Sequence, residues 1–173
     1  MENSKLLNKF FELGHQHKLL EKSPFELLTW EECINNINKH LSQDLYVKVL
    51  GDFSIATHDL SEMSKVQEIL KYIKKVHPNR SQTAHMYCNI SISGGTFGLH
   101  VDDQDTWIWQ CAGVTKWAMH YHAHNTKDKQ RTGVVIHELK PGNMLYIPKG
   151  LYHSTKPLTP RFSISFVVGD EQQ

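Results

Sequence analysis

Three residues in the second half of the chain have the types and spacing of metal ligands. His100 and Asp102 are two positions apart, so on a β-strand both side chains point to the same face and can converge on one ion. His153 follows a short apolar segment bracketed by turn residues, and it begins a further predicted strand. Two histidines and one carboxylate, with open positions opposite, are the ligand set of non-haem Fe(II) oxygenases, and without a nearby thiolate they do not resemble a structural zinc site. The sequence therefore predicts an iron(II) site.

Glycines recur around these ligands in two halves. The halves read Gly94-x5-His100-x-Asp102-x3-Thr106-x6-Gly113 and Gly142-x5-Pro148-x-Gly150-x2-His153. This pattern resembles the paired motifs of cupins, with aspartate replacing the second histidine and Thr106 standing where many cupins have a glutamate. The run HVDDQDTWIWQCAGVTKW resembles the corresponding strand of JmjC-type 2-oxoglutarate oxygenases, including ribosomal-oxygenase-like protein hydroxylases. The resemblance covers roughly residues 84–168.

This resemblance implies both a fold and an activity. The fold would be a double-stranded β-helix, the cupin or jelly-roll barrel. The activity would be that of a dioxygenase, which uses Fe(II), 2-oxoglutarate and O2 to hydroxylate a substrate C–H and releases succinate and CO2. A protein side chain is the expected substrate, with a ribosomal or translation component as one option. A small-molecule or nucleic-acid hydroxylase stays open, as does a non-redox metal-binding cupin such as an isomerase or a ligand-binding module.

The distal carboxylate of 2-oxoglutarate needs a cation or strong hydrogen-bond donors, and three candidates for this role stay open. Arg161 is the first candidate. It lies two positions before Ser163 on a predicted strand, so the two side chains share one face, and a guanidinium suits bidentate carboxylate binding. Many JmjC-type enzymes place a Lys or Arg two residues after the glycine equivalent to Gly113, but that position is Thr115, and Lys116 follows it. A bulge at the glycine could re-aim Lys116, and Thr115 with Tyr87 is the third option.

Further polar residues are predicted near the cosubstrate. Thr106 stands where JmjC-type enzymes often have a polar residue that contacts 2-oxoglutarate. Residues 85–93 alternate strictly, and Tyr87 and Asn89 share the polar face. That face could line the barrel lumen and bind 2-oxoglutarate, or it could face solvent.

The periodicity of the sequence places helices first and strands afterwards. Helices are predicted over residues 4–22, from Ser23 to about residue 42, and over 60–76, with a short strand pair at 46–50 and 53–56. Barrel strands are predicted at 85–93, 96–101, 105–112, 115–121, 133–138, 143–147, 151–155 and 161–168. The chain is thus expected to be mainly β with N-terminal helices: residues 1–82 form a helical region packed on the barrel, residues 83–173 form the catalytic core, and the whole is one compact domain.

The second helix has a specific predicted start. Ser23, Pro24 and Glu26 have the spacing of a capping box with proline at the first helical position. The apolar residues that follow at helical spacing predict the core-facing side, namely Leu27, Trp30, Ile34, Ile37 and Leu41.

The composition of the chain bears on its binding partners and its cellular location. The chain has 19 basic and 18 acidic residues, a net charge of +1, so its charge does not indicate nucleic acid or an anionic membrane as a partner. Its three cysteines are widely spaced, which favours buried, reduced thiols, and no apolar run predicts a signal peptide or a membrane span. We expect a cytoplasmic protein, with a homodimer left open.

Two other groups of residues could carry chemistry. His120, His122 and His124 alternate and could bind a second metal, although a solvated strand end is favoured. The indoles of Trp107, Trp109 and Trp117 could stack a substrate ring, although filling core space between the barrel and the helices is favoured.

Overall fold

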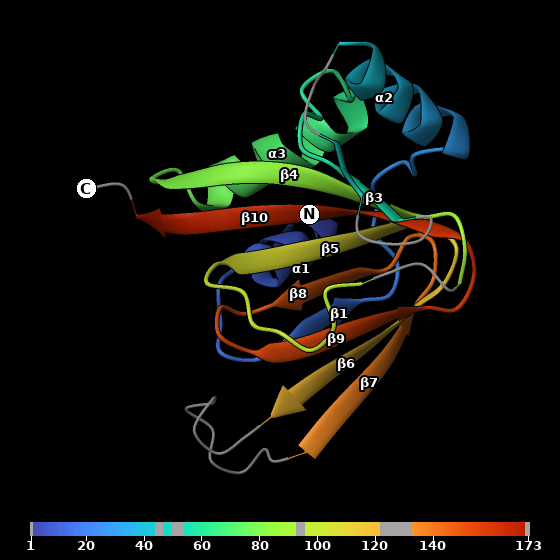
Figure 1. Ribbon diagram of the computed structural model, residues 1–173. Helices are drawn as coiled ribbons and strands as arrows, with labels where there is room; N and C mark the ends of the chain where they lie inside the picture. The colour runs from blue at the N-terminus through green and yellow to red at the C-terminus, as the bar shows by residue number, and fades with distance from the viewer. Residues whose placement is uncertain (1, 44–46, 50–53, 93–95, 122–132, 172–173) are drawn as a thin grey trace.

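The structure, a computed structural model, describes residues 2–43, 47–49, 54–92, 96–121 and 133–171 (Figure 1). The helices are α1 (Glu2–Phe11), α2 (Trp30–Ser42) and α3 (Ser64–Val76). The strands are β1 (Lys18–Leu20), β2 (Val47–Val49), β3 (Ser54–Thr57), β4 (Arg80–Asn89), β5 (Asp105–Ala112), β6 (Thr115–Tyr121), β7 (Gly133–Leu139), β8 (Met144–Ile147), β9 (Tyr152–Pro157) and β10 (Arg161–Glu171).

The strands form two antiparallel sheets that face each other. The larger sheet has the order β1-β8-β5-β10-β4-β3-β2, and the smaller one has the order β7-β6-β9. An isolated bridge between His100 and His153 extends the smaller sheet beyond β9. From β5 to β10 the chain crosses repeatedly between the sheets, with β5, β8 and β10 in the larger one and β6, β7 and β9 in the smaller one. This is the arrangement of a double-stranded β-helix, and the predicted mainly β fold class is confirmed.

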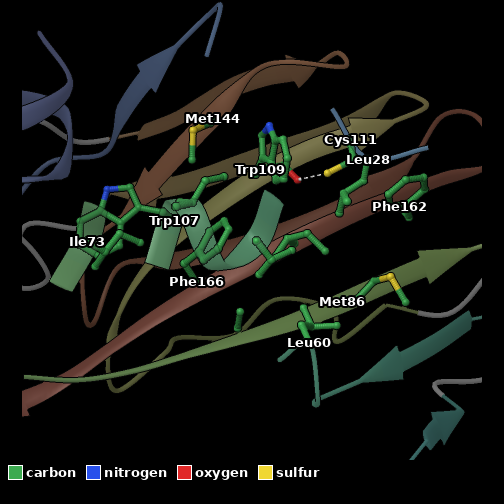
Figure 2. Packing of buried hydrophobic residues seen from close by; sticks show 14 of the residues in the cluster. Leu28, Leu60, Ile73, Met86, Trp107, Trp109, Cys111, Met144, Phe162 and Phe166 are labelled. Atoms are coloured by element: carbon green, nitrogen blue, oxygen red, sulfur yellow. Dashed lines mark hydrogen bonds between the residues drawn. The ribbon is translucent and has the colours of Figure 1, made fainter. Parts of the chain in front are cut away.

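Helices cover only the larger sheet, as Figure 1 shows. Along β10, Phe162, Ile164 and Phe166 point toward the helices, whereas Arg161 and Ser163 point into the barrel, as the period of two in a strand requires. The helix-side cluster joins residues of α1, α2 and α3 to the strands, and Figure 2 shows part of it. A second cluster fills the barrel lumen, formed by Ile108, Trp117, Met119, Tyr121, Leu139, Leu145, Ile147 and Leu151.

The three tryptophans divide between these clusters. Trp107 and Trp109 are fully buried on the helix side of the larger sheet (Figure 2), which confirms the predicted core role. Trp117 instead faces the lumen and lines its cavity. Cys33, Cys88 and Cys111 are buried, as predicted.

The first predicted helix was too long. It ends at Phe11, and residues 18–20 form β1, which pairs with β8. Tyr146 Oη bonds both the N–H and the carbonyl of Gly14, each at 2.9 Å, and so holds a turn where the prediction continued the helix. Contacts distant in sequence therefore outweighed the helical periodicity.

The second predicted helix was wrong in its start and its face. Thr29, not Ser23, is the N-cap: its hydroxyl accepts from Glu32 N at 3.2 Å, and Glu32 accepts from Thr29 N at 2.7 Å. The predicted face is largely exposed, with Trp30 at 37%, Ile34 at 51% and Leu41 at 63%. Of that face within the helix, only Ile37 is buried; the buried residues of α2 are Cys33, Asn36, Ile37 and His40.

Polar contacts explain why α2 turns this side inward. Asn36 donates to Asp59 O at 3.1 Å and accepts from the Thr57 hydroxyl at 2.9 Å. His40 contacts Asn36 O through Nδ1 and accepts from Asp59 N through Nε2. Because buried polar groups must be paired, these bonds fix a helix face that an apolar pattern does not reveal.

The remaining strands follow the predictions with two corrections. The strand predicted at 85–93 runs instead from Arg80 to Asn89, where the Asn89 side-chain amide donates to the Ser54 hydroxyl. Ser93 and Gly94 lie outside the described residues. The strand predicted at 96–101 is reduced to the bridge at His100, because Gly98 has a positive φ of 71°. The short strand pair is confirmed as β2 and β3. The boundary after residue 82 stays a prediction.

Among the described residues, no helix has the length and apolar character that crossing a membrane requires.

Candidate metal centre

The structure brings His100, Asp102 and His153 together. One potential ligand atom from each lies within 4.8 Å of the others. His100 Nε2 is 3.6 Å from Asp102 Oδ1, and His153 Nε2 is 3.6 Å from Asp102 Oδ2. Such separations suit three ligands that share one ion at about 2.0–2.2 Å from each.

Backbone pairing sets the two histidines side by side. His100 N donates to His153 O at 3.0 Å, and His153 N donates to His100 O at 2.9 Å. The two ring centroids are 4.3 Å apart. The Asp102 carbonyl accepts from Gly150 N at 2.9 Å, so the turn before β9 also holds the segment that carries the aspartate.

Hydrogen bonds also orient each imidazole. Nδ1 of His100 lies 3.1 Å from Gly98 O, and Nδ1 of His153 lies 2.9 Å from Leu151 O. A carbonyl only accepts, so each Nδ1 carries the proton in these bonds, and each Nε2 keeps its lone pair for an ion. Burial lowers the pKa of His153, which favours the neutral imidazole that a metal requires.

A cavity of about 190 Å³ adjoins the three residues inside the barrel. Tyr87, Asn89, Arg161 and Ser163 line it, so four of the predicted cosubstrate residues reach it. The polar face of β4 at Tyr87 and Asn89 therefore points into the lumen, which resolves the two readings of that strand. Burial raises the pKa of Tyr87, so its phenol is neutral and can donate.

Arg161 is a buried cation in this cavity. It is 6% exposed, and burial lowers its pKa to about 10. Nη1 donates to the Ser163 hydroxyl at 2.6 Å and to Tyr87 O at 3.5 Å. Across the described ranges of the chain, Nε has no hydrogen-bond partner and no carboxylate pairs with the guanidinium. Since buried charges are normally paired, the cavity is suited to an anion.

Gly113 permits this placement of Arg161. Its φ is +68°, and a Cβ there would lie 2.0 Å from Pro160 O and 2.7 Å from Arg161 Cβ. The backbone between β5 and β6 thus passes directly against the start of β10. Only glycine fits this approach.

The other predicted cosubstrate residues lie outside the cavity lining. Thr106 donates to Asp102 Oδ2 at 3.5 Å and so contacts a candidate ligand. Thr115 is buried, and its hydroxyl lacks a partner within the described part of the chain. Lys116 alternates with the inward-facing Thr115 and Trp117 and pairs across the smaller sheet with Glu138 and Lys156. The register shift in β5 falls before Gly113, opposite Phe162 and Ser163.

Several cavity residues were not predicted: Ser54, Thr96, Phe97, Thr155 and Ser165. Thr155 and Ser165 could have been found, because each lies two residues after a predicted site residue on the same strand. Ser54 comes from β3, in the half of the chain that carries no motif. Of the three alternating histidines, His122 and His124 lie outside the described residues.

The fold and the site together define the class of this protein. The JmjC domain matches residues 60–173, more than half of the chain, and the chain belongs to this family. The suspected resemblance is therefore confirmed. JmjC oxygenases use Fe(II), 2-oxoglutarate and O2, and the donor set found here fits such an ion.

Individual similar proteins also include oxygenases. Mouse "Ribosomal oxygenase 2" is 30% identical over 89 residues, which is 45% of this chain and 19% of that protein. The Escherichia coli ribosomal oxygenase YcfD in complex with cobalt and succinic acid superposes with a TM-score of 0.67 at 15% identity, over 91% of this chain and 49% of that one. The same protein with cobalt and 2-oxoglutarate gives a TM-score of 0.58 at 15% identity, over 98% and 44%. At such identities the likeness to the solved structures concerns the fold. The chain spans about half the length of YcfD, or less, and about a fifth of the mouse relative.

Proposed function

We propose that this chain is an Fe(II)- and 2-oxoglutarate-dependent oxygenase that hydroxylates a C–H bond of a protein side chain. The observation that carries the proposal is one cavity lined by His100, Asp102 and His153 and also by the Arg161 guanidinium, which pairs with no carboxylate in the described part of the chain. A metal chelator with a distal carboxylate requires this combination. A metal-binding cupin that takes an uncharged ligand has no use for a buried cation in its cavity.

In this proposal His100, Asp102 and His153 hold Fe(II) from one side. When bound, Fe(II) with 2-oxoglutarate and O2 supplies the oxidising power for the C–H bond, with succinate and CO2 as products. The protein orients its ligands: Gly98 O and Leu151 O fix the imidazoles. Thr106 acts on Asp102 by its hydrogen bond, rather than on the cosubstrate.

Arg161 is the proposed anchor for the distal carboxylate of 2-oxoglutarate. Its Nε donor is free within the described structure, and Ser163 holds Nη1 in place. Tyr87 and Asn89 line the same cavity and are proposed to contact the cosubstrate. Lys116 and Thr115 have no such role in this proposal, because neither lines the cavity.

The substrate proposal rests on the relatives. The mouse protein and YcfD are both ribosomal oxygenases by name, so a ribosomal or other translation protein is the proposed substrate class. The cytoplasmic location and the homodimer remain predictions from the sequence.

The first test is an anaerobic titration of 2-oxoglutarate into the Fe(II)-loaded protein. We expect the visible charge-transfer band of a metal-chelated keto acid in the wild type and its loss in His100→Ala. This measurement needs no substrate. Iron binding without a band would disprove the oxygenase and leave a non-redox cupin.

A further inference from the structure

The segment that carries two candidate ligands is also an open edge of the smaller sheet. The N–H and C=O of His100 both bond to β9. Val101 lies between His100 and Asp102, whose main-chain groups bond to β9 and to the turn before it, so the N–H and C=O of Val101 point away from β9. Leu99 lies on the other side of His100, at a bend of the chain. Neither residue has a main-chain hydrogen bond to any part of the chain that the structure describes. The described structure therefore leaves two main-chain donors and two main-chain acceptors without a main-chain partner beside the metal centre.

The two candidate ligands on this segment are also the more exposed ones. The side chains of His100 and Asp102 are 31% and 34% exposed, whereas His153 is 2% exposed. The alternate side chains are apolar and face solvent, with Leu99 at 56% and Val101 at 42%. Two of the three candidate ligands and the apolar side chains that flank His100 are therefore accessible to solvent together.

We propose that an extended segment of the protein substrate binds as an added strand along Leu99–Val101, with its target side chain beside His100 and Asp102. Free main-chain groups on an exposed sheet edge bind peptides in this way. The reaction at the target rests on the proposed function, whereas the added strand itself does not.

The pleat predicts a sequence pattern for the bound segment. Neighbouring residues on paired strands point to the same face, so the residue beside His100 points to the metal centre. The residues before and after it lie beside Leu99 and Val101, whose exposed apolar side chains favour apolar neighbours. Phe97 lines the cavity, is 49% exposed and has its ring centroid 5.6 Å from that of His100, so it can cover the target side chain. The expected pattern is a target residue flanked by two apolar residues.

The test begins with a phage-displayed library of random dodecapeptides, selected on the full chain loaded with Mn(II) and 2-oxoglutarate. Mn(II) replaces iron so that no turnover occurs. Selected peptides are synthesised, their Kd values are measured, and each main-chain nitrogen is methylated in turn. Because a methylated amide cannot donate, methylation at alternate residues should weaken binding about tenfold, as expected from the loss of one net hydrogen bond of about 1–1.5 kcal/mol. Methylation at the residues between them should have little effect.

A pair of variants locates the edge. Val101→Asp should weaken the same peptides about tenfold, and Val134→Asp, at a valine 53% exposed on β7, should not. Failure to select any peptide, methylation effects without a period of two, or equal effects of both variants would each overturn the added strand. The charge-transfer titration separates the two proposals: peptide binding with alternate sensitivity but no band would retain the added strand and reject the oxygenase.

Discussion

At the scale of single residues, substitutions of Arg161 test its proposed role as the anchor of the 2-oxoglutarate carboxylate. Arg161→Gln should raise the Kd for 2-oxoglutarate about 10- to 100-fold, because a hydrogen bond to a charged group contributes about 1.5–3 kcal/mol. Arg161→Lys should fall between, since lysine keeps the charge but lacks the planar fork. The measurement is the charge-transfer titration, with iron content determined in parallel.

Lys116→Gln is the matched control, because the sequence also offered Lys116 as a candidate anchor for the 2-oxoglutarate carboxylate. Its Kd for 2-oxoglutarate should equal that of the wild type, since Lys116 lies outside the cavity lining. If Lys116→Gln weakens binding and Arg161→Gln does not, the assignment of the anchor is wrong.

The grouping of His100, Asp102 and His153 was predictable from sequence, whereas the choice among the candidate anchors was not. His100 and Asp102 need only a period of two, and His153 needs only a turn before it. The choice between Arg161 and Lys116 depends on where the register of β5 shifts and on the close approach at Gly113. No local pattern encodes either feature.

At the scale of elements, the connection between β5 and β6 positions β10. Gly113→Ala should destabilise the fold by about 1–3 kcal/mol and weaken 2-oxoglutarate binding, because the new methyl group would displace Pro160 and Arg161. Thermal unfolding and the 2-oxoglutarate titration measure the two effects.

Gly142→Ala separates backbone strain from this collision. Gly142 also has a positive φ, 91°, but a Cβ there would meet nothing within 4 Å. It should lower stability and leave the affinity for 2-oxoglutarate unchanged. Equal affinity losses in both variants would contradict the role given to Gly113.

The cap of α2 allows a second test at this scale. Thr29→Ala should lower the unfolding free energy by about 0.5–2 kcal/mol, because it removes one half of a capping box. Ser23→Ala, at the cap that the sequence predicted, should change it by less, since the Ser23 hydroxyl has no partner among the described residues. Denaturant unfolding of both variants ranks the two caps, and the reverse order would contradict the observed helix start.

Both errors in the N-terminal half have one cause. The predictions there used only patterns of neighbouring residues, but β1 and α2 are held in place by hydrogen bonds to residues distant in the sequence. Tyr146 holds the turn at Gly14, and Thr57 and Asp59 pair with the polar side of α2. The barrel strands were predicted more closely because strict alternation requires only that one face be buried.

At the scale of the whole molecule, the helices and the barrel share one core. The rings of Phe11 and Trp107 lie 5.8 Å apart, and Trp107 Nε1 donates to Phe10 O at 3.3 Å. Phe11→Ala should therefore destabilise the protein by about 3–5 kcal/mol. Metal-site absorbance and far-ultraviolet circular dichroism should be lost in one transition at a lower temperature.

Leu6→Ala on the same helix is the control. Leu6 is 56% exposed, so its loss should change the unfolding temperature little. Two separate unfolding transitions in Phe11→Ala would show that the barrel is stable without the helices. That result would contradict a core shared by the helices and the barrel.

On the proposed function, the buried guanidinium of Arg161 would also link the lifetime of the protein to its metabolic surroundings. An unpaired cation in the interior disfavours the folded state, and an anion that pairs with it binds the folded chain but not the unfolded one. The free energy of folding then rises with the logarithm of the concentration of that anion. On the proposed function that anion is 2-oxoglutarate, so a cell depleted of this keto acid would hold more unfolded chain and would degrade the enzyme sooner than a replete one.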